Sequence, residues 1–199
     1  VIHTSYSRCS AFYCFIQDIE PYPNGFAVQF PYPLKSGGMR ARVHPIDRQV
    51  YLTCQKGWDT SARYDGAIYR IRHTGEPVRG VTSAAVTSTG LQLTFGADLD
   101  PDSVKAAAFS AVRESDKKDK KNPNAKPPQV KLGEVRLVDS KTIAVEIPGI
   151  GKEDLTQRTS DSGVVSINPP ISLTWSLKSK DGTAIEQTIH ATVNTVPNE

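Results

Sequence analysis

The sequence lacks several features that would assign a function class at once. No run of about 18 apolar residues occurs, so nothing in the sequence is expected to span a membrane. The first residues show no basic segment followed by an apolar stretch, as a signal peptide would. They begin in mid-pattern without an initiator Met, which predicts a fragment or a processed product. The net charge of +3 is small and predicts a solvated surface with no affinity for nucleic acid.

Cysteine is scarce, with three residues in the chain: Cys9, Cys14 and Cys54. No Cys-x-x-Cys pair occurs, so the sequence encodes neither a paired-thiolate metal site nor covalent haem attachment. Cys9 and Cys14 are five residues apart and would point to opposite faces of a regular strand, which argues against a local disulfide. The count leaves open one disulfide involving Cys54, in an oxidising compartment, or three buried free thiols.

Histidine is also scarce and shows no metal-ligand spacing. The four residues, His3, His44, His73 and His190, are therefore interpreted as structural or exposed. No catalytic residue and no metal ligand is assigned to this chain.

What the chain has in abundance is short strands between turns. Pro and Gly number 14 each, and helical periodicity is absent from the first region, residues 1–78. Its segments are rich in aromatic and β-branched residues separated by turn sequences, which is typical of a propeller blade or a sandwich. The strands expected here are Ala11–Ile16, Gly25–Phe30, Met39–His44, Val50–Cys54 and Ala67–Arg72.

A linker, Glu76–Gly80, precedes a second region of different composition. Short strands recur here at the spacing of an immunoglobulin-like sandwich, with a strong hairpin turn at Lys180–Thr183. Leu91, Leu93 and Phe95 share one face, as do Leu173, Trp175 and Leu177, which predicts core positions. The expected strands are Val81–Val86, Leu91–Phe95, Ala111–Arg113, Lys131–Leu137, Thr142–Ile147, Ile171–Lys178 and Thr188–Val193.

Two further segments of the second region stand apart from the strands. Asp100 followed by Pro101 and an Ala-rich run up to Phe109 predicts one short helix, because Asp is a good N-cap and Pro suits the first helical position. Residues 113–128 are charged and contain proline, which predicts a solvated loop.

With these segments assigned, the chain resembles a known family. Residues 1–78 resemble the end of the propeller in bacterial sorbosone-dehydrogenase-like proteins, which are similar to soluble quinoprotein glucose dehydrogenases and are often fused to c-type cytochrome modules. Residues 81–196 resemble the β-sandwich that follows. The motifs that carry the resemblance are His3–Tyr6, Ser36–Arg42, Pro45–Tyr51, Gly57-Trp58, Asp65–Gly75, Leu91–Phe95, Leu99–Pro101, Asp181-Gly182 and Thr188–His190.

The chain departs from the family's pattern at three points. Arg48 stands where relatives usually have Gly, so the turn is expected to take another shape. The charged loop 113–128 replaces an aromatic-rich segment, and the cytochrome motif is missing. The histidine base of quinoprotein dehydrogenases matches none of the four histidines.

Arginine alternation gives the one candidate contact site. Arg40 and Arg42 share a strand face, and Arg70 and Arg72 show the same alternation. Such a cationic strip suits an anionic group of a substrate, a cofactor or a neighbouring domain. The alternative is ion pairing with Asp47, Asp59 or Asp65.

The residues and the resemblance together give the following expectations. The fold is all-β, with partial propeller blades in residues 1–78 and an immunoglobulin-like sandwich with one short helix in 79–199. Trp58 plugs a core between blades. The chain is the non-catalytic C-terminal part of a periplasmic or secreted redox protein, and it serves closure, stability or docking.

The resemblance implies no cofactor in this chain itself. Pyrroloquinoline quinone (PQQ) or haem c would belong to the parent protein, which would be a dehydrogenase. The expected partners are the rest of the propeller or other subunits. Two alternatives remain open: a carbohydrate-binding or adhesive sandwich, marked by an exposed aromatic platform on the second region, and a structural subunit of a larger assembly.

Overall fold

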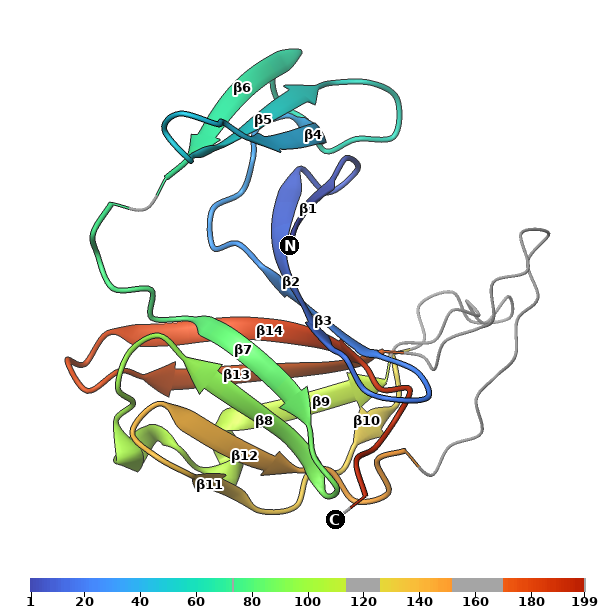
Figure 1. Cartoon of the computed structure of the whole chain (residues 1–199), viewed down its shortest axis with the longest axis vertical. Helices are drawn as coiled ribbons and strands as arrows, with labels where there is room; N and C mark the ends of the chain where they lie inside the picture. The colour runs from blue at the N-terminus through green and yellow to red at the C-terminus, as the bar shows by residue number, and fades with distance from the viewer. Residues whose placement is uncertain (73, 114–125, 152–169, 199) are drawn as a thin grey trace. The chain divides into compact units, whose positions relative to one another are not determined.

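The computed structural model describes residues 1–72, 74–113, 126–151 and 170–198 (Figure 1). Within them the chain is all-β, as the alternation predicts. Its internal contacts divide the chain into two compact units. The first unit is Val1–Cys14 with Ala27–Pro77, and the second unit is Phe15–Phe26 with Val78–Glu199.

This division differs from the expected domains 1–78 and 79–199 at the segment Phe15–Phe26 and at the single residue Val78. Two amide side chains explain why the segment belongs with the second unit. Asn24, which is 1% exposed, accepts hydrogen bonds at Oδ1 from the backbone N–H of Asn194 (2.7 Å) and Thr195 (3.0 Å). Gln17 exchanges two hydrogen bonds with the backbone of Val86 (2.8 and 3.0 Å).

The first unit contains a three-stranded antiparallel sheet in the order β4-β5-β6. It also contains a strand that the sequence interpretation missed, β1, which pairs antiparallel with β2. A register shift between Gly38 and Arg40 interrupts the β4–β5 pairing. Strands β2 and β3 each have residues in both units. The strand bounds are β1 Ile2–Ser5, β2 Ser10–Gln17, β3 Asn24–Gln29, β4 Gly37–Val43, β5 Val50–Gln55 and β6 Gly66–Ile71.

Two glycines let β4 approach the residues around β1. A Cβ at Gly37 would lie 2.6 Å from the carbonyl oxygen of Tyr6, and a Cβ at Gly38 would lie 2.9 Å from the Cβ of Thr4. Such distances are too short for any side chain at these positions. The Gly37-Gly38 pair thus begins β4 and permits close packing.

The second unit consists of two antiparallel sheets. One has the order β11-β12-β8-β7, and the other contains β14-β13-β9-β10 with β3 beside β14. Of the expected strand Lys131–Leu137, only Val135–Leu137 is a strand, and a separate two-residue strand, Gln129–Val130, precedes it. The bounds are β7 Val81–Val86, β8 Gly90–Phe95, β9 Phe109–Arg113, β10 Gln129–Val130, β11 Val135–Leu137, β12 Thr142–Glu146, β13 Ile171–Lys178 and β14 Ala184–Thr192.

The core of the second unit lies between these two sheets. The rings of Phe95 on β8 and Trp175 on β13 meet edge to face at 5.7 Å, so one sheet packs on the other. The two predicted core faces are confirmed, since every member is at most 2% exposed. They comprise Leu91, Leu93, Phe95, Leu173, Trp175 and Leu177.

The expected helix is not an α-helix. Asp100 does cap the segment, accepting from the Asp102 N–H at 3.0 Å, and Pro101 stands at the first position. The structure nevertheless has two short 3-10 turns, Pro101–Ser103 and Ala106–Ala108. Phe109 then enters β9 and pairs with Trp175, so sheet pairing overrides the helical preference of the alanines.

Three other expectations concern turns and connections. The hairpin turn between β13 and β14 is confirmed, with Gly182 at φ +83°. Arg48 adopts φ +58°, a left-handed backbone conformation that glycine favours, and the expected change of turn shape relative to the family stays a prediction. Residues 114–125 of the predicted charged loop lie outside the described residues.

None of the helical segments described has the length and apolar character needed to cross a bilayer.

Candidate functional site

The β4-β5-β6 sheet brings three of the four predicted arginines onto one face. Directly opposed residues of an antiparallel pair share a face. Arg42 is opposite Tyr51, which is opposite Arg70. A second row runs Arg40, Thr53 and Ile68. We call these residues the arginine face, defined by the list Arg40, Arg42, Tyr51, Thr53, Ile68 and Arg70.

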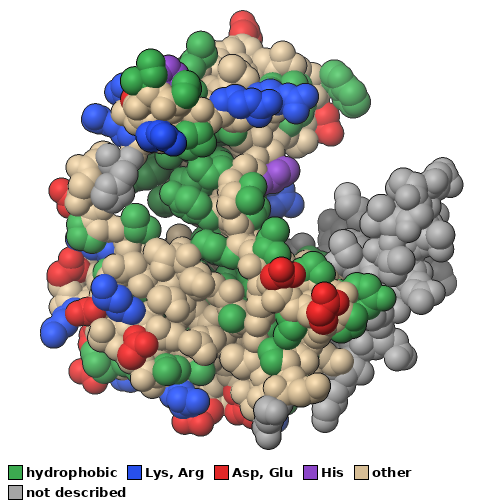
Figure 2. All heavy atoms as spheres, viewed as in Figure 1, with side chains coloured by type: hydrophobic (Ala, Val, Ile, Leu, Met, Phe, Trp, Pro, Cys, Tyr) green, Lys and Arg blue, Asp and Glu red, His purple; other side chains and the backbone are tan. Residues whose placement is uncertain are grey.

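Arg72 is less well defined. It follows the last residue of β6, Ile71, so no strand pairing assigns it to the face. All four arginines are exposed. Lys and Arg side chains gather over this sheet in the space-filling view (Figure 2).

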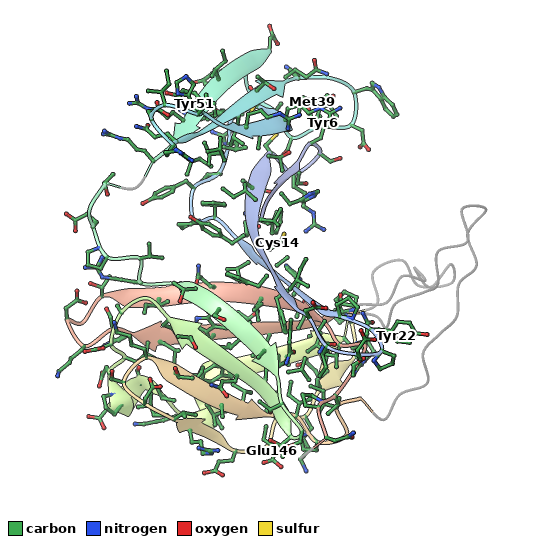
Figure 3. All side chains as sticks on the ribbon, viewed as in Figure 1. Tyr6, Cys14, Tyr22, Met39, Tyr51 and Glu146 are labelled. Carbon is green, nitrogen blue, oxygen red and sulfur yellow. The ribbon has the colours of Figure 1, made fainter. Side chains whose placement is uncertain are left out.

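Tyr51, labelled in Figure 3, lies between Arg42 and Arg70 in the strand pairing and contacts residues of the β4–β5 turn. Its hydroxyl donates to Oδ2 of Asp47 at 2.8 Å, and its ring meets the His44 ring at 5.7 Å. The Gln49 N–H donates to Oδ1 of Asp47 at 3.0 Å. This bond, more than those from Tyr51 and His44, holds the pKa of Asp47 below its ordinary value.

The alternative of ion pairing does not account for the arginines. Lys56 pairs with Asp65 at 3.9 Å, and Asp47 is engaged by Tyr51, Gln49 and His44. Among the described side chains, no ion pair joins any of the four arginines to a carboxylate. The guanidinium groups keep their charge at any ordinary pH. The arginine face therefore carries positive charge that no described carboxylate neutralises.

The first unit also exposes many large apolar side chains. Ile68 on the arginine face is 77% exposed, and Ile46 in the β4–β5 turn is 86% exposed. Large apolar patches on a protein surface mark interaction sites. The exposed large apolar residues of the first unit are Val1, Tyr13, Tyr32, Met39, Val43, Ile46, Trp58, Tyr64 and Ile68.

Trp58 corrects one sequence prediction. It was expected to plug a core, but it is 89% exposed. Tyr6 packs against the neighbouring backbone instead, because a Cβ at Gly57 would overlap the Tyr6 hydroxyl oxygen. The turn after β5 thus packs Gly57 against the half-buried Tyr6 and leaves the Trp58 indole in solvent.

His190 takes part in a row of polar pairs between β13 and β14. Ser172 and His190 are directly opposed, with the Ser172 hydroxyl 2.7 Å from Nδ1 of His190. The next pair on this face, Thr174 and Thr188, joins hydroxyl oxygens at 2.8 Å, and Ser176 donates to Glu186 at 3.2 Å. This repetition along one hairpin gives the Ser–His contact a cross-strand, structural role.

The cysteines are free thiols, two of them buried. Cys9 and Cys54 are 3% and 8% exposed, and Cys14 is half-buried. Burial raises the pKa of the Cys54 thiol, and the nearby Cys9 raises it further. Neither effect creates the thiolate that a nucleophile or a metal ligand needs.

The described ranges contain no cluster of three or more His, Cys, Asp or Glu side chains suited to a metal ion. The comparisons give no assignment either: no protein-family model, curated protein or solved structure matches the chain.

Sequence reasoning found the arginines of the site but missed its apolar members. Ile68 has the same parity as Arg70 along β6, so the alternation alone would have put it on the same face. Ile46 and Trp58 lie in turns, where alternation gives no direction, and only the folded chain shows that they are exposed.

Proposed function

We propose that this chain is a non-catalytic assembly module: the first unit packs against further β-structure of a larger protein, and the second unit stabilises and presents it. The observation that carries the proposal is the imbalance in the first unit. Its large apolar side chains are more often exposed than buried, which is costly for a unit that functions alone.

We further propose that the second unit is an immunoglobulin-like sandwich. Its strand order supports this class. With β7 to β14 labelled A, B, C, C′, D, E, F and G in chain order, the two sheets have the orders D-E-B-A and G-F-C-C′. Immunoglobulin-type sandwiches divide their strands between sheets in the same way.

For the first unit we propose propeller strands whose neighbours come from elsewhere in the parent protein. The antiparallel meander β4-β5-β6 with an open edge at β6 supports this assignment. Following the sequence resemblance, the parent is an exported, periplasmic or secreted sugar-oxidising quinoprotein or haem-linked redox protein. PQQ or haem c would then be bound by the parent outside this chain.

One rival function has an observation in its favour. The exposed Tyr32, Trp58 and Tyr64 of the first unit could contact a sugar ring, as carbohydrate-binding modules do. The platform expected on the second region is not where the aromatic residues are exposed: Phe95, Phe109 and Trp175 are all buried. The sandwich version of this function therefore has less support than an assembly role for the first unit.

Hydroxyl-radical footprinting tests the assembly role. Met39, the only methionine of the chain, is 45% exposed, and Trp58 is 89% exposed, so both should oxidise rapidly in the chain alone. In the protein isolated from its own cells, the proposal predicts strong protection of both. Tyr22 of the second unit, 47% exposed, is the internal control and should react equally in both samples.

Equal oxidation of Met39 and Trp58 in the two samples would reject the assembly role. The carbohydrate-binding rival makes its own prediction. Sugars would protect Trp58 and quench its fluorescence in the chain alone, and W58A would abolish that response.

A further inference from the structure

The strand β6 offers an unpaired edge. It pairs with β5 on one side, and the described part of the chain supplies no strand on the other. The opposite edge of the sheet, at β4, is crowded by the residues around β1, as Gly38 beside Thr4 shows. Unpaired N–H and C=O groups along an edge strand are a template for an added strand. Any added strand should therefore join at β6.

On one face of the sheet, a strand added at β6 would have to carry apolar side chains. Leu52 and Cys54 on β5 are 0% and 8% exposed, so their face of the sheet is buried. Tyr69 and Ala67, which lie opposite them on β6, are only half-buried. Burial therefore weakens toward the open edge, and an added strand with apolar residues on this face would complete the layer.

On the arginine face, the added strand would have to carry a carboxylate. An added strand would place alternate side chains directly beside Ile68 and Arg70. Arg70 has no ion pair among the described residues, and Asp47 is engaged by Tyr51 and Gln49. A carboxylate opposite Arg70 would meet a planar guanidinium that can bind it through two hydrogen bonds.

We propose that the β6 edge binds an extended acidic polypeptide strand by β-augmentation. On the arginine face this strand carries a carboxylate opposite Arg70, and on the other face it carries apolar side chains over Ala67, Tyr69 and Ile71. The proposal rests on the assembly role above and adds the position and chemistry of the partner segment.

Peptide titration monitored by backbone amide NMR tests the proposal. The probes are two short peptides, one alternating valine with glutamate and the other alternating valine with lysine. The glutamate peptide should shift the amide signals of residues 66–72 and should bind at least about fivefold more tightly than the lysine peptide, the factor expected for about one favourable cross-strand ion pair.

Three charge reversals sharpen the test. R70E should weaken binding of the glutamate peptide by about fivefold or more and strengthen binding of the lysine peptide. R42E, two strands from the edge, should have a smaller effect. R136E makes the same charge change at an exposed position of β11 in the second unit and should leave the preference unchanged.

Absence of binding, shifts confined to other strands, or equal binding of the two peptides would overturn the proposal. Its failure is distinguishable from failure of the assembly role. If Met39 and Trp58 are protected in the native protein while R70E leaves the peptide preference unchanged, the module assembles but its partner strand is not acidic. If they are not protected, the assembly role itself is wrong.

Discussion

The two units treat their apolar side chains differently. In the second unit, both sheets send large side chains into one shared interior, where Phe95 meets Trp175. In the first unit, the large apolar residues that are exposed outnumber the apolar residues that are buried. The buried apolar residues of the first unit are Cys9, Ala11, Val28, Phe30, Leu52 and Cys54.

This difference has a structural cause. A sheet buries one face only where another layer covers it. In the second unit each sheet covers the other, but the three strands β4, β5 and β6 are too few to enclose a comparable core. The comparison teaches that one chain can combine a unit with an enclosed core and a unit that leaves many large apolar side chains exposed.

The two tryptophans give the largest expected contrast between the units. W175A should lower the free energy of unfolding of the second unit by about 3–5 kcal/mol, because it empties a site that is 2% exposed beside Phe95. W58A, at a site 89% exposed, should change stability by less than about 0.5 kcal/mol. Urea denaturation of both variants measures the free energies of unfolding. Similar losses of stability in W175A and W58A would contradict the difference between the two units.

Two fully buried leucines test whether the units unfold separately. L52A should remove about 2–5 kcal/mol from the first unit, enough to expose β4–β6 while the second unit stays folded. L93A should act on the second unit instead. Hydrogen exchange resolved by segment distinguishes the two variants. Faster exchange of β13 in L52A would show that the two units share one core, contrary to this account.

Asn24 tests the assignment of residues 15–26 to the second unit. N24L should cost about 1–3 kcal/mol, since it leaves the N–H groups of Asn194 and Thr195 without their acceptor. The loss should appear as faster exchange at β14. Q29A, on the same strand at an exposed position, is the matched control. If N24L and Q29A had equal effects on stability and on exchange at β14, the assignment of residues 15–26 to the second unit would be wrong.

Asp181 gives the smallest effect, and it depends on pH. The Ser179 hydroxyl, at 2.5 Å, and then Arg79 hold the pKa of Asp181 well below its usual range. A group with a depressed folded-state pKa contributes stability above its unfolded pKa of about 4 and loses it as the pH falls. The melting temperature of D181N should therefore lie below wild type at neutral pH, with the gap closing in acid. A gap independent of pH would contradict this assignment.

Much of the fold could be predicted from the sequence because alternation is a local property. The faces of Leu91–Phe95 and Ile171–Lys178 are correct since each side chain's direction follows from its neighbours along the strand. The Asp181-Gly182 turn is also predicted correctly, because a turn is determined by its own few residues. The helix predicted to include Ala106–Ala108 is wrong, because Phe109 pairs in the sheet with Trp175, which is far away in the sequence.

The candidate site shows the same limit. Alternation put Arg40 and Arg42 on one face, but the row Arg42–Tyr51–Arg70 depends on pairing among three strands. The exposure of Trp58 could not be predicted, because Tyr6, more than 50 positions earlier, occupies the space at Gly57. Long-range contacts thus decide what single-sequence patterns leave undetermined.

The most direct test of the central claim is hydrogen exchange at β6, compared between the chain alone and the protein isolated from its own cells. The account predicts that the β6 amides pointing away from β5 exchange rapidly in the chain alone and become strongly protected in the native protein, while β13 is protected in both. Rapid exchange of those amides in both samples would mean that the first unit gains no strand at this edge, and it would contradict the account.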